Sequence, residues 1–215
     1  MAMRGALERG LYFAADAGVA TPERLIRVTR AALEGGVVLV QLRAKEMGAQ
    51  TMVGLARGLV ALCGEFGVPL LVNDLPDVAA TAGAAGVHVG QEDVSVADAR
   101  RMLGEDAIVG ATTPTPEAVR RAEAEGADYV SAGPMFRSPT KPSKPVAGPE
   151  LARRLRGVTE LPLCVIGGIT AANVHELADC GVDLVCVISA IASAADPRAA
   201  TEELIAAMRR AGMAT

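Results

Sequence analysis

Short runs of apolar residues alternate with longer amphipathic segments along this chain, and this alternation constrains the fold more than any other feature. The apolar runs are continuously hydrophobic, as in strands that helices cover in a parallel sheet. Eight alternating units in 215 residues predict an α/β fold, a (β/α)8 TIM barrel that forms a single domain over residues 1–215. The expected strands are Leu11–Ala14, Val37–Leu42, Leu70–Asn73, Val87–Val89, Ala107–Ala111, Tyr129–Ala132, Leu163–Ile166 and Leu184–Ile188.

The segments between the expected strands carry start signals for helices. Threonine, proline and glutamate follow one another at Thr21 and again at Thr115, and Ser95 precedes a third amphipathic run. We expect another helix to begin at Thr170 and the last helix to cover Pro197–Arg210. An open, doubly wound sheet is the alternative fold, but neither GxGxxG nor GxxxxGK[ST] follows the first expected strand.

The composition argues against several classes of function. The formal net charge is -4 at pH 7 and aromatic residues make up 2% of the chain, so no nucleic-acid partner is expected. The apolar runs carry charges or fall far short of the roughly 20 residues that a membrane span needs, so no membrane partner is expected either. Arg4, Glu8 and Arg9 interrupt any run that would resemble a signal peptide, which predicts a cytoplasmic protein. The oligomeric state stays open, and a homo-oligomer is compatible with a small barrel.

A strand end with one amide and two cations is the first candidate for binding. Gln41, Arg43 and Lys45 are spaced by two residues, so extended backbone directs them to one face. The carboxyl ends of barrel strands line the active-site mouth. Arginine binds phosphate oxygens as a fork and lysine as a point charge, so the trio favours an anionic, phosphate-bearing ligand. A solvated strand end is the simpler alternative.

Carboxylates follow the third and fourth expected strands. Asn73 and Asp74 stand at the end of the third, and Asp93 follows the fourth. Two carboxylates on adjacent strand ends suit Mg2+, which takes a few carboxylates, waters and substrate phosphate oxygens. Helix capping is the alternative for either aspartate. His88, inside the fourth strand, is expected to be a packed, hydrogen-bonded core residue with no catalytic role.

The sixth expected strand leads into the longest irregular loop, residues 133–148. Connections in compact α/β domains usually have about 2 to 6 residues, so a loop of this length predicts a function. It contains Arg137, Ser138, Thr140 and Lys141, which together are cationic and rich in hydroxyls. We expect this loop to act as a cover over the mouth; a proline-rich excursion without function is the alternative.

Glycines and a serine follow the last two expected strands. Gly167 and Gly168 end the seventh unit, and Ser189 follows the eighth strand. Glycine lets backbone amides approach a phosphate, and a short helix after the eighth strand would direct its amino end to the same place. This is the usual phosphate site of (β/α)8 barrels.

These motifs, in this order, resemble the thiamine-phosphate synthase family, and the resemblance extends over essentially all eight units. The resembling stretches are Gln41–Lys45, Val72–Asp74, Gly86–Asp93, Asp128–Phe136 with Thr140 and Lys141, Ile166–Ile169 and Val187–Ala190. The resemblance implies a transferase that joins 4-amino-5-hydroxymethyl-2-methylpyrimidine diphosphate to 4-methyl-5-(2-hydroxyethyl)thiazole phosphate. Pyrophosphate leaves with the help of Mg2+, and the reaction passes through a pyrimidine cation.

The resemblance also implies roles for the residues at the matching positions. The residues implied in catalysis are Arg43, Lys45, Thr112 and Lys141. The residues implied in binding the two small-molecule substrates are Gln41, Arg43, Lys45, Asn73, Thr112, Ser138, Thr140, Lys141, Gly168, Ile188 and Ser189. The resemblance implies that Asp74 and Asp93 coordinate Mg2+.

Several positions depart from the family pattern, and two of these departures bear on activity. Leu75 stands where a basic residue is usual, and Pro114 stands where a histidine is usual. They keep one alternative open, a non-catalytic regulator that binds thiazole phosphate. A thiazole tautomerase of the same superfamily is the other alternative. The tautomerase is disfavoured because the expected histidine after the fifth strand is missing while the metal and diphosphate groups are present.

Overall fold

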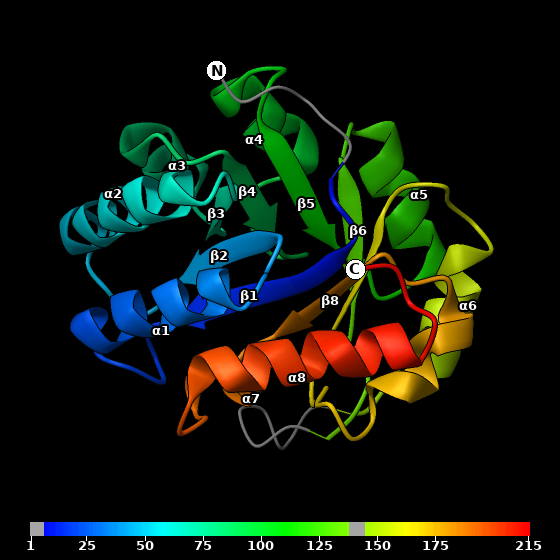
Figure 1. Ribbon diagram of the computed structural model, residues 1–215. Coiled ribbons are helices and arrows are strands. Elements are labelled where there is room, and N and C mark those ends of the chain that lie inside the picture. Colours follow the sequence, from blue (N-terminus) through cyan, green and yellow to red (C-terminus); the bar gives the residue numbers. More distant parts are fainter. Residues whose placement is uncertain (1–6, 138–144) are drawn as a thin grey trace.

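Eight parallel strands close into a barrel in sequence order, from β1 next to β2 through to β8 next to β1 (Figure 1). The computed structural model describes residues 7–137 and 145–215. The strands are β1 Gly10–Asp16, β2 Leu39–Arg43, β3 Leu70–Asn73, β4 Gly86–Val89, β5 Ile108–Thr112, β6 Tyr129–Ala132, β7 Leu163–Ile166 and β8 Leu184–Val187. The closed barrel confirms the predicted fold class and rules out the open doubly wound sheet.

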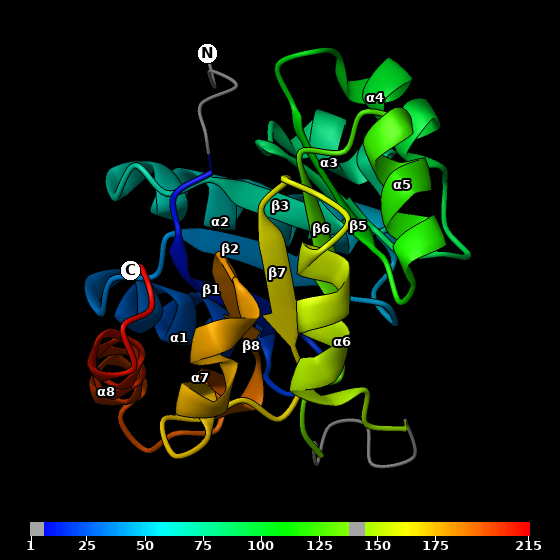
Figure 2. The same cartoon turned by 90° about the vertical axis from the view of Figure 1, so that its right-hand side faces the viewer.

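Helices surround the barrel on its outside (Figures 1 and 2). They are α1 Pro22–Glu34, α2 Ala49–Glu65, α3 Pro76–Ala82, α4 Val96–Leu103, α5 Pro116–Ala124, α6 Gly148–Arg156, the 3-10 helix η1 Val174–Cys180, the short α7 Ser189–Ala192 and α8 Pro197–Arg210. The last helix packs beside the first, which closes the outer ring where the barrel also closes. No helix within the described ranges combines the length and hydropathy needed to cross a membrane.

The strands have two apolar faces, as expected for a sheet buried on both sides. Leu11 and Phe13 belong to the large cluster between strands and helices. Tyr12 belongs to a smaller cluster that includes Leu39 and Leu71. Because side chains alternate along a strand, this smaller cluster fills the barrel interior. Continuing the alternation along β1 and β2 directs Asp16, Gln41 and Arg43 toward the interior at the carboxyl end.

The expected element positions agree closely with the structure except at one helix. Three strands and the last helix have the predicted bounds, and the other strands differ by one or two residues at one or both ends. The exception is the helix expected to begin at Thr170. The structure instead has a 3-10 helix that begins at Val174, because the Asn173 side chain accepts a hydrogen bond from the Thr170 amide and donates one to the Gly168 carbonyl. These bonds hold the preceding residues in a turn.

Two arginine–aspartate pairs, Arg100 with Asp128 and Arg156 with Asp183, each connect a helix to neighbouring strands at the amino-terminal ends of the strands. The Asp128 carboxylate accepts hydrogen bonds from the Val109 amide at 2.7 Å and from Arg100, whose side chain is almost fully buried. The Asp183 carboxylate likewise accepts hydrogen bonds from the Leu163 amide and from Arg156. Each pair links a helix to two strands, which stabilises the scaffold from the end opposite the mouth.

Three predicted helix caps are present, and one yields a stability prediction. The Thr115 hydroxyl accepts a hydrogen bond from the Ala118 amide at 3.2 Å at the start of α5. Thr115→Ala should lower the free energy of unfolding by about 1 kcal/mol, because an amide of the first turn loses its acceptor. Thr115→Ser keeps the hydroxyl and should retain most of the stabilisation that the cap provides. Urea denaturation of the three proteins measures the difference, and equal losses in both variants would contradict the capping role.

Candidate functional site

Polar side chains from three strands, β2, β3 and β5, meet at the carboxyl end of the barrel. Gln41 is buried within β2, Arg43 ends β2, Asn73 ends β3 and Thr112 ends β5. Each strand from β2 to β5 pairs with the next one in the barrel, so these side chains lie near one another at its carboxyl end. The barrel therefore brings together residues that are up to 71 positions apart, between Gln41 and Thr112, as the strand-end pattern predicts.

Arg43 is held by a buried carboxylate. Its Nη1 atom lies 2.5 Å from Oδ2 of Asp16, which ends β1, next to β2. Asp16 is only 2% exposed, and its other oxygen accepts a hydrogen bond from the Gly18 amide at 2.9 Å. Both oxygens of Asp16 are thus occupied within the protein. The pair fixes the direction of the guanidinium, so that its remaining donors are available to an anionic ligand.

Lys45 and Asp74 form a second ion pair at the mouth, with Nζ 2.7 Å from Oδ2. Asp74 has a φ of +65°, a left-handed conformation that is uncommon for residues other than glycine. The Asp74 amide donates to the His88 carbonyl of β4 at 2.8 Å, which holds the turn in place. Strained backbone of this kind costs free energy and occurs often at functional sites. Here it directs a carboxylate to the mouth between β3 and β4.

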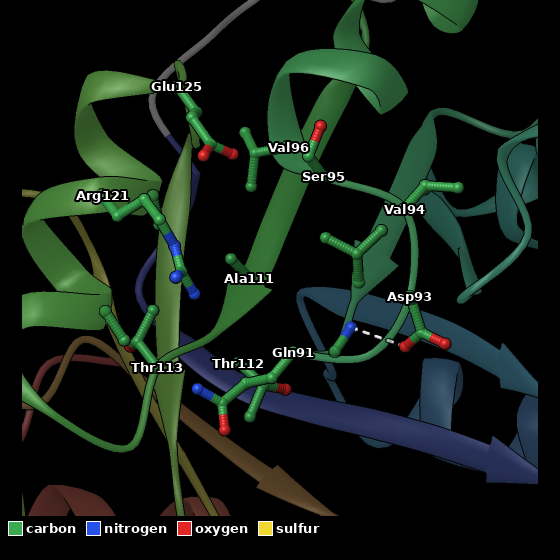
Figure 3. Close-up of a pocket in the computed structure, with 14 residues that line it drawn as sticks. Gln91, Asp93, Val94, Ser95, Val96, Ala111, Thr112, Thr113, Arg121 and Glu125 are labelled. Atoms are coloured by element: carbon green, nitrogen blue, oxygen red, sulfur yellow. Dashed lines mark hydrogen bonds between the residues drawn. The ribbon is translucent and has the colours of Figure 1, made fainter.

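Asp93 approaches Asp74 from the loop that follows β4. One Asp93 oxygen accepts a hydrogen bond from the Gly90 amide at 2.8 Å, which Figure 3 shows as a dashed line. Partial burial raises the pKa of the Asp93 carboxyl, and so does the adjacent Asp74 carboxylate, while the Gly90 amide and the Lys45 ammonium group oppose the shift. The two neighbouring carboxylates form a site of negative potential.

The chemistry of this carboxylate pair fits Mg2+. No group of three or more His, Cys, Asp or Glu side chains suited to a metal occurs within residues 7–137 and 145–215. An ion at Asp74 and Asp93 would thus draw its other ligands from water and from a substrate. Mg2+ is commonly bound in this way, through one or two carboxylates and phosphate oxygens. Neither Asp74 nor Asp93 caps a helix, which argues against the alternative that these two residues are helix caps.

A cavity of about 270 Å3 opens beside this cluster, between the ends of β4 and β5 and the helices α4 and α5 (Figure 3). Asp93, Gln91 and Thr112 are among the residues that line it. Arg121 of α5 and Glu125, which directly follows α5, line it as well (Figure 3). The predicted catalytic hydroxyl of Thr112 and the predicted metal ligand Asp93 therefore border the same space.

A second cavity of about 370 Å3 lies over the ends of β7 and β8. The predicted phosphate-binding residues Gly168, Ile188 and Ser189 all line it, together with Arg137. Gly168 has a φ of +66°, and a Cβ there would collide with the carbonyl oxygens of Phe136 and Arg137. Glycine at this position therefore allows the segment after β6 to lie against the end of β7. The sequence pattern did not single out Arg137 from its loop; only its place in this cavity does.

Three predicted site residues, Ser138, Thr140 and Lys141, lie outside the described residues. Leu75 and Pro114, which depart from the family pattern, lie within the described residues. Leu75 precedes α3 and is 38% exposed, and Pro114 is half-buried between β5 and α5. Neither side chain enters an ion pair of the kind formed by Arg43 or Lys45. The ion pairs of Arg43 and Lys45 therefore form in a chain that has leucine and proline at these two positions.

His88 forms hydrogen bonds on both sides of its ring, as expected for a packed histidine, although one partner belongs to the candidate site. Nδ1 lies 2.8 Å from the hydroxyl of Tyr129, and Nε2 lies 2.9 Å from the hydroxyl of Thr112. Burial lowers the pKa of His88 to about 4, and the Asp93 carboxylate opposes this shift. The ring is therefore neutral at pH 7. The connection to Thr112 is a tertiary feature that sequence reasoning missed.

The lowered pKa of His88 predicts a pH dependence of stability. In the unfolded chain histidine binds a proton near pH 6.5, whereas the folded chain resists protonation until about pH 4. The stabilisation linked to neutral His88 is therefore present above pH 6.5 and is lost as the pH falls toward 4. The free energy of unfolding should fall more steeply across this window in the wild type than in His88→Gln. Equal slopes in urea titrations would contradict the lowered pKa.

Comparison with known proteins places these features in a family. The family model described as thiamine monophosphate synthase matches residues 11–191. A thiamine-phosphate synthase from Thermosynechococcus vestitus is 44% identical over 186 residues, which cover 86% of this chain and 53% of that protein. A thiamine-phosphate synthase from Shouchella clausii is 40% identical over 190 residues, which cover 87% of this chain and 90% of that one. The chain thus spans about half of the first relative and nine-tenths of the second.

A solved structure agrees with these sequence similarities. The thiamine phosphate pyrophosphorylase from Pyrococcus furiosus superposes with a TM-score of 0.85 at 34% identity, covering 97% of this chain and 98% of that one. The family match, the identity to both relatives and the shared barrel lead to one conclusion. The chain belongs to the thiamine monophosphate synthase family.

Proposed function

We propose that this chain is a thiamine-phosphate synthase. It condenses 4-amino-5-hydroxymethyl-2-methylpyrimidine diphosphate with 4-methyl-5-(2-hydroxyethyl)thiazole phosphate and releases thiamine phosphate and pyrophosphate. The observation that carries the proposal is the convergence of Arg43, Lys45, Asp74 and Asp93 at one side of a mouth whose other side holds the glycine-lined cavity at Gly168. A cytoplasmic location, and small molecules as the partners, belong to the same proposal.

The two sides of the mouth suit the two substrates. Gln41, Arg43, Lys45 and Asn73 supply amide and cationic donors, which match a diphosphate and a heteroaromatic ring. The cavity at β7 and β8, with Gly168, Ile188 and Ser189, combines glycine backbone with apolar walls, which match a thiazole that carries a phosphate. The sequence resemblance assigns Lys141 to the diphosphate, and Ser138 and Thr140 to hydroxyl positions in the loop that covers the mouth.

The site has the groups that a dissociative reaction needs. When the carbon–oxygen bond to the diphosphate breaks, negative charge develops on the leaving oxygens and positive charge on the pyrimidine methylene carbon. Arg43, Lys45 and Lys141 stabilise the leaving group, and the Thr112 hydroxyl donates a hydrogen bond to it. Asp74 and Asp93 would hold Mg2+, which neutralises diphosphate charge when bound. The thiazole nitrogen then attacks the carbon, and holding both substrates in one mouth provides the alignment.

The direct test is turnover by the purified chain. Both substrates are incubated with the protein and Mg2+, and thiamine phosphate and pyrophosphate are measured in parallel. The proposal expects equal amounts of both products and loss of turnover when EDTA removes the divalent ion. Thiazole phosphate binding without turnover would identify the regulator instead, and conversion of a thiazole isomer without pyrophosphate release would identify the tautomerase.

The glycine-lined cavity gives a separate prediction. Gly168→Ala should raise the KM for thiazole phosphate about tenfold, because the added Cβ displaces the carbonyls of Phe136 and Arg137 and strains a left-handed backbone. Gly157→Ala is the matched control, since Gly157 has an ordinary φ of -68° and room for a Cβ. Steady-state kinetics with each substrate varied in turn measure the change. An unchanged KM for the thiazole in Gly168→Ala would place the phosphate elsewhere.

A further inference from the structure

A chain of four side chains crosses the barrel interior and ends at the mouth. The Tyr12 hydroxyl lies 3.2 Å from the Tyr129 hydroxyl, which lies 2.8 Å from Nδ1 of His88, and Nε2 of His88 lies 2.9 Å from the Thr112 hydroxyl. Tyr12 and Tyr129 are 2% and 0% exposed, whereas Thr112 is exposed and lines the cavity beside Asp93. One end of this chain of side chains is thus sealed, and the other is exposed at the carboxyl end of β5.

The barrel register builds the chain. His88 of β4 is level with Gly110 of β5, and Gly110 is level with Tyr129 of β6. The Tyr129 ring lies over Gly110, where a Cβ would overlap the ring atoms, and stacks on the imidazole with centroids 5.5 Å apart. Glycine in the middle strand therefore lets residues on two strands that are not neighbours make a hydrogen bond. Tyr12, from β1, meets the Tyr129 ring edge-on across the interior.

The sealed end sets the direction of the protons. Burial raises the pKa of both phenols well above the usual value near 10, so each keeps its proton. Among the described residues, the hydrogen-bond partner of the Tyr12 hydroxyl is Tyr129, so Tyr12 donates to Tyr129. Tyr129 must then donate to Nδ1 of His88, which makes Nδ1 an acceptor. A neutral ring with an unprotonated Nδ1 carries its proton on Nε2 and donates it to the Thr112 oxygen.

The other proton arrangements leave a buried donor without a partner. If Thr112 donated to Nε2, then Nδ1 would donate to Tyr129, Tyr129 to Tyr12, and the Tyr12 proton would have no acceptor. A doubly protonated His88 has the same consequence. An unsatisfied buried donor destabilises the folded state, so the first arrangement is favoured. In that arrangement the Thr112 hydroxyl receives a hydrogen bond from the protein and keeps its own proton for the mouth.

We propose that Tyr129 and His88 are positioning residues that hold the Thr112 hydroxyl as a hydrogen-bond donor to the substrate diphosphate. Ionised phosphate oxygens only accept hydrogen bonds, so a Thr112 that donated to His88 would present lone pairs to them. The proposal rests on the proposed function for the identity of the substrate. The direction of the hydrogen bonds is inferred from the contacts inside the barrel alone and does not depend on the identity of the substrate.

The first test needs no interior substitution. The chain has two histidines, and His175 lies exposed on η1. With 15N-labelled histidine, His175→Gln removes one imidazole from the spectrum and assigns the other to His88. At pH 7.5 the ring nitrogen shifts of His88 should show a proton on Nε2 and none on Nδ1. A proton on Nδ1, or on both nitrogens, overturns the proposal.

The second test asks whether Tyr129 acts through Thr112. Tyr129→Phe removes the hydroxyl that holds Nδ1 as an acceptor, and it should lower kcat about tenfold with a smaller change in KM. In a Thr112→Val background the same substitution should lower kcat less than twofold, because no hydroxyl remains to be oriented. Thr112→Ser keeps the hydroxyl and should restore the sensitivity to Tyr129→Phe. Equal losses in both backgrounds would show a purely structural effect and overturn the positioning role.

Failure of the proposed function has a different signature. In that case the wild-type chain forms no thiamine phosphate from the two substrates, and the assignment of the diphosphate as the acceptor is overturned with it. An active wild-type chain that has the other His88 tautomer, or that gives additive losses in the double variant, overturns only the positioning role. The histidine spectrum is read in either case, and Tyr12→Phe should leave the tautomer unchanged because Tyr129 still donates to Nδ1.

Discussion

Asp93→Asn is expected to lower kcat/KM for thiamine phosphate formation about 100- to 1,000-fold without lowering the stability of the fold. The loss follows from removing one of two carboxylates that would hold Mg2+, whose stabilisation of developing charge is worth several kcal/mol. Excess Mg2+ should recover part of the activity, because the asparagine oxygen remains a weak ligand. The measurement is initial rate against Mg2+ concentration for the wild type and the variant.

The sign of the stability effect follows from the pKa. The pKa of the Asp93 carboxyl is raised in the folded chain, by burial and by the neighbouring Asp74 carboxylate, so its ionised form opposes folding at neutral pH. Asparagine removes this charge while its oxygen can still accept from the Gly90 amide. The melting temperature should therefore stay equal or rise.

Glu92→Gln is the matched control for Asp93→Asn. It removes one exposed negative charge from the adjacent position and should change neither rate nor stability beyond the error. If Asp93→Asn and Glu92→Gln had equal activities, the metal role of Asp93 would be wrong. If Asp93→Asn were clearly less stable than the wild type, the repulsion between the two carboxylates would be wrong.

Arg43→Met is expected to reduce both activity and stability. Activity should fall about 100-fold or more, because a forked donor to the diphosphate is lost. The free energy of unfolding should fall by about 3 kcal/mol, because the Asp16 carboxylate, only 2% exposed, is left without its cation. Arg30→Met is the control, since the Arg30–Glu65 pair is exposed and an exposed pair contributes less than about 1 kcal/mol.

A double variant separates the two effects of Arg43. Arg43→Met with Asp16→Asn replaces the buried charge as well, and the asparagine oxygen can still accept from the Gly18 amide. Stability should return to within about 1 kcal/mol of the wild type, while activity should stay as low as in Arg43→Met. Urea denaturation and kcat/KM on the same preparations measure both. Recovery of activity in the double variant would show that Arg43 acts through folding alone.

The candidate site could be anticipated in outline from the chain. Gln41, Arg43, Asn73, Asp74 and Asp93 were placed at one mouth because they end or follow parallel strands, and every parallel barrel gathers its strand ends at one rim. The Gly168 cavity followed from the same rule. The helix expected from Thr170 was wrong because Asn173 bonds to the backbone of the turn, and such a local competition is hard to read from periodicity.

The sequence by itself determined the order of strands and helices, because hydrophobic periodicity, caps and glycines act over a few residues. It also determined which residues reach the rim. Only the tertiary structure decided their partners: Asp16 with Arg43, Asp74 with both Lys45 and Asp93, and Tyr129 with His88 across Gly110. Those contacts depend on the stagger of strands in a closed barrel, which brings together side chains far apart in the chain and which no local pattern encodes.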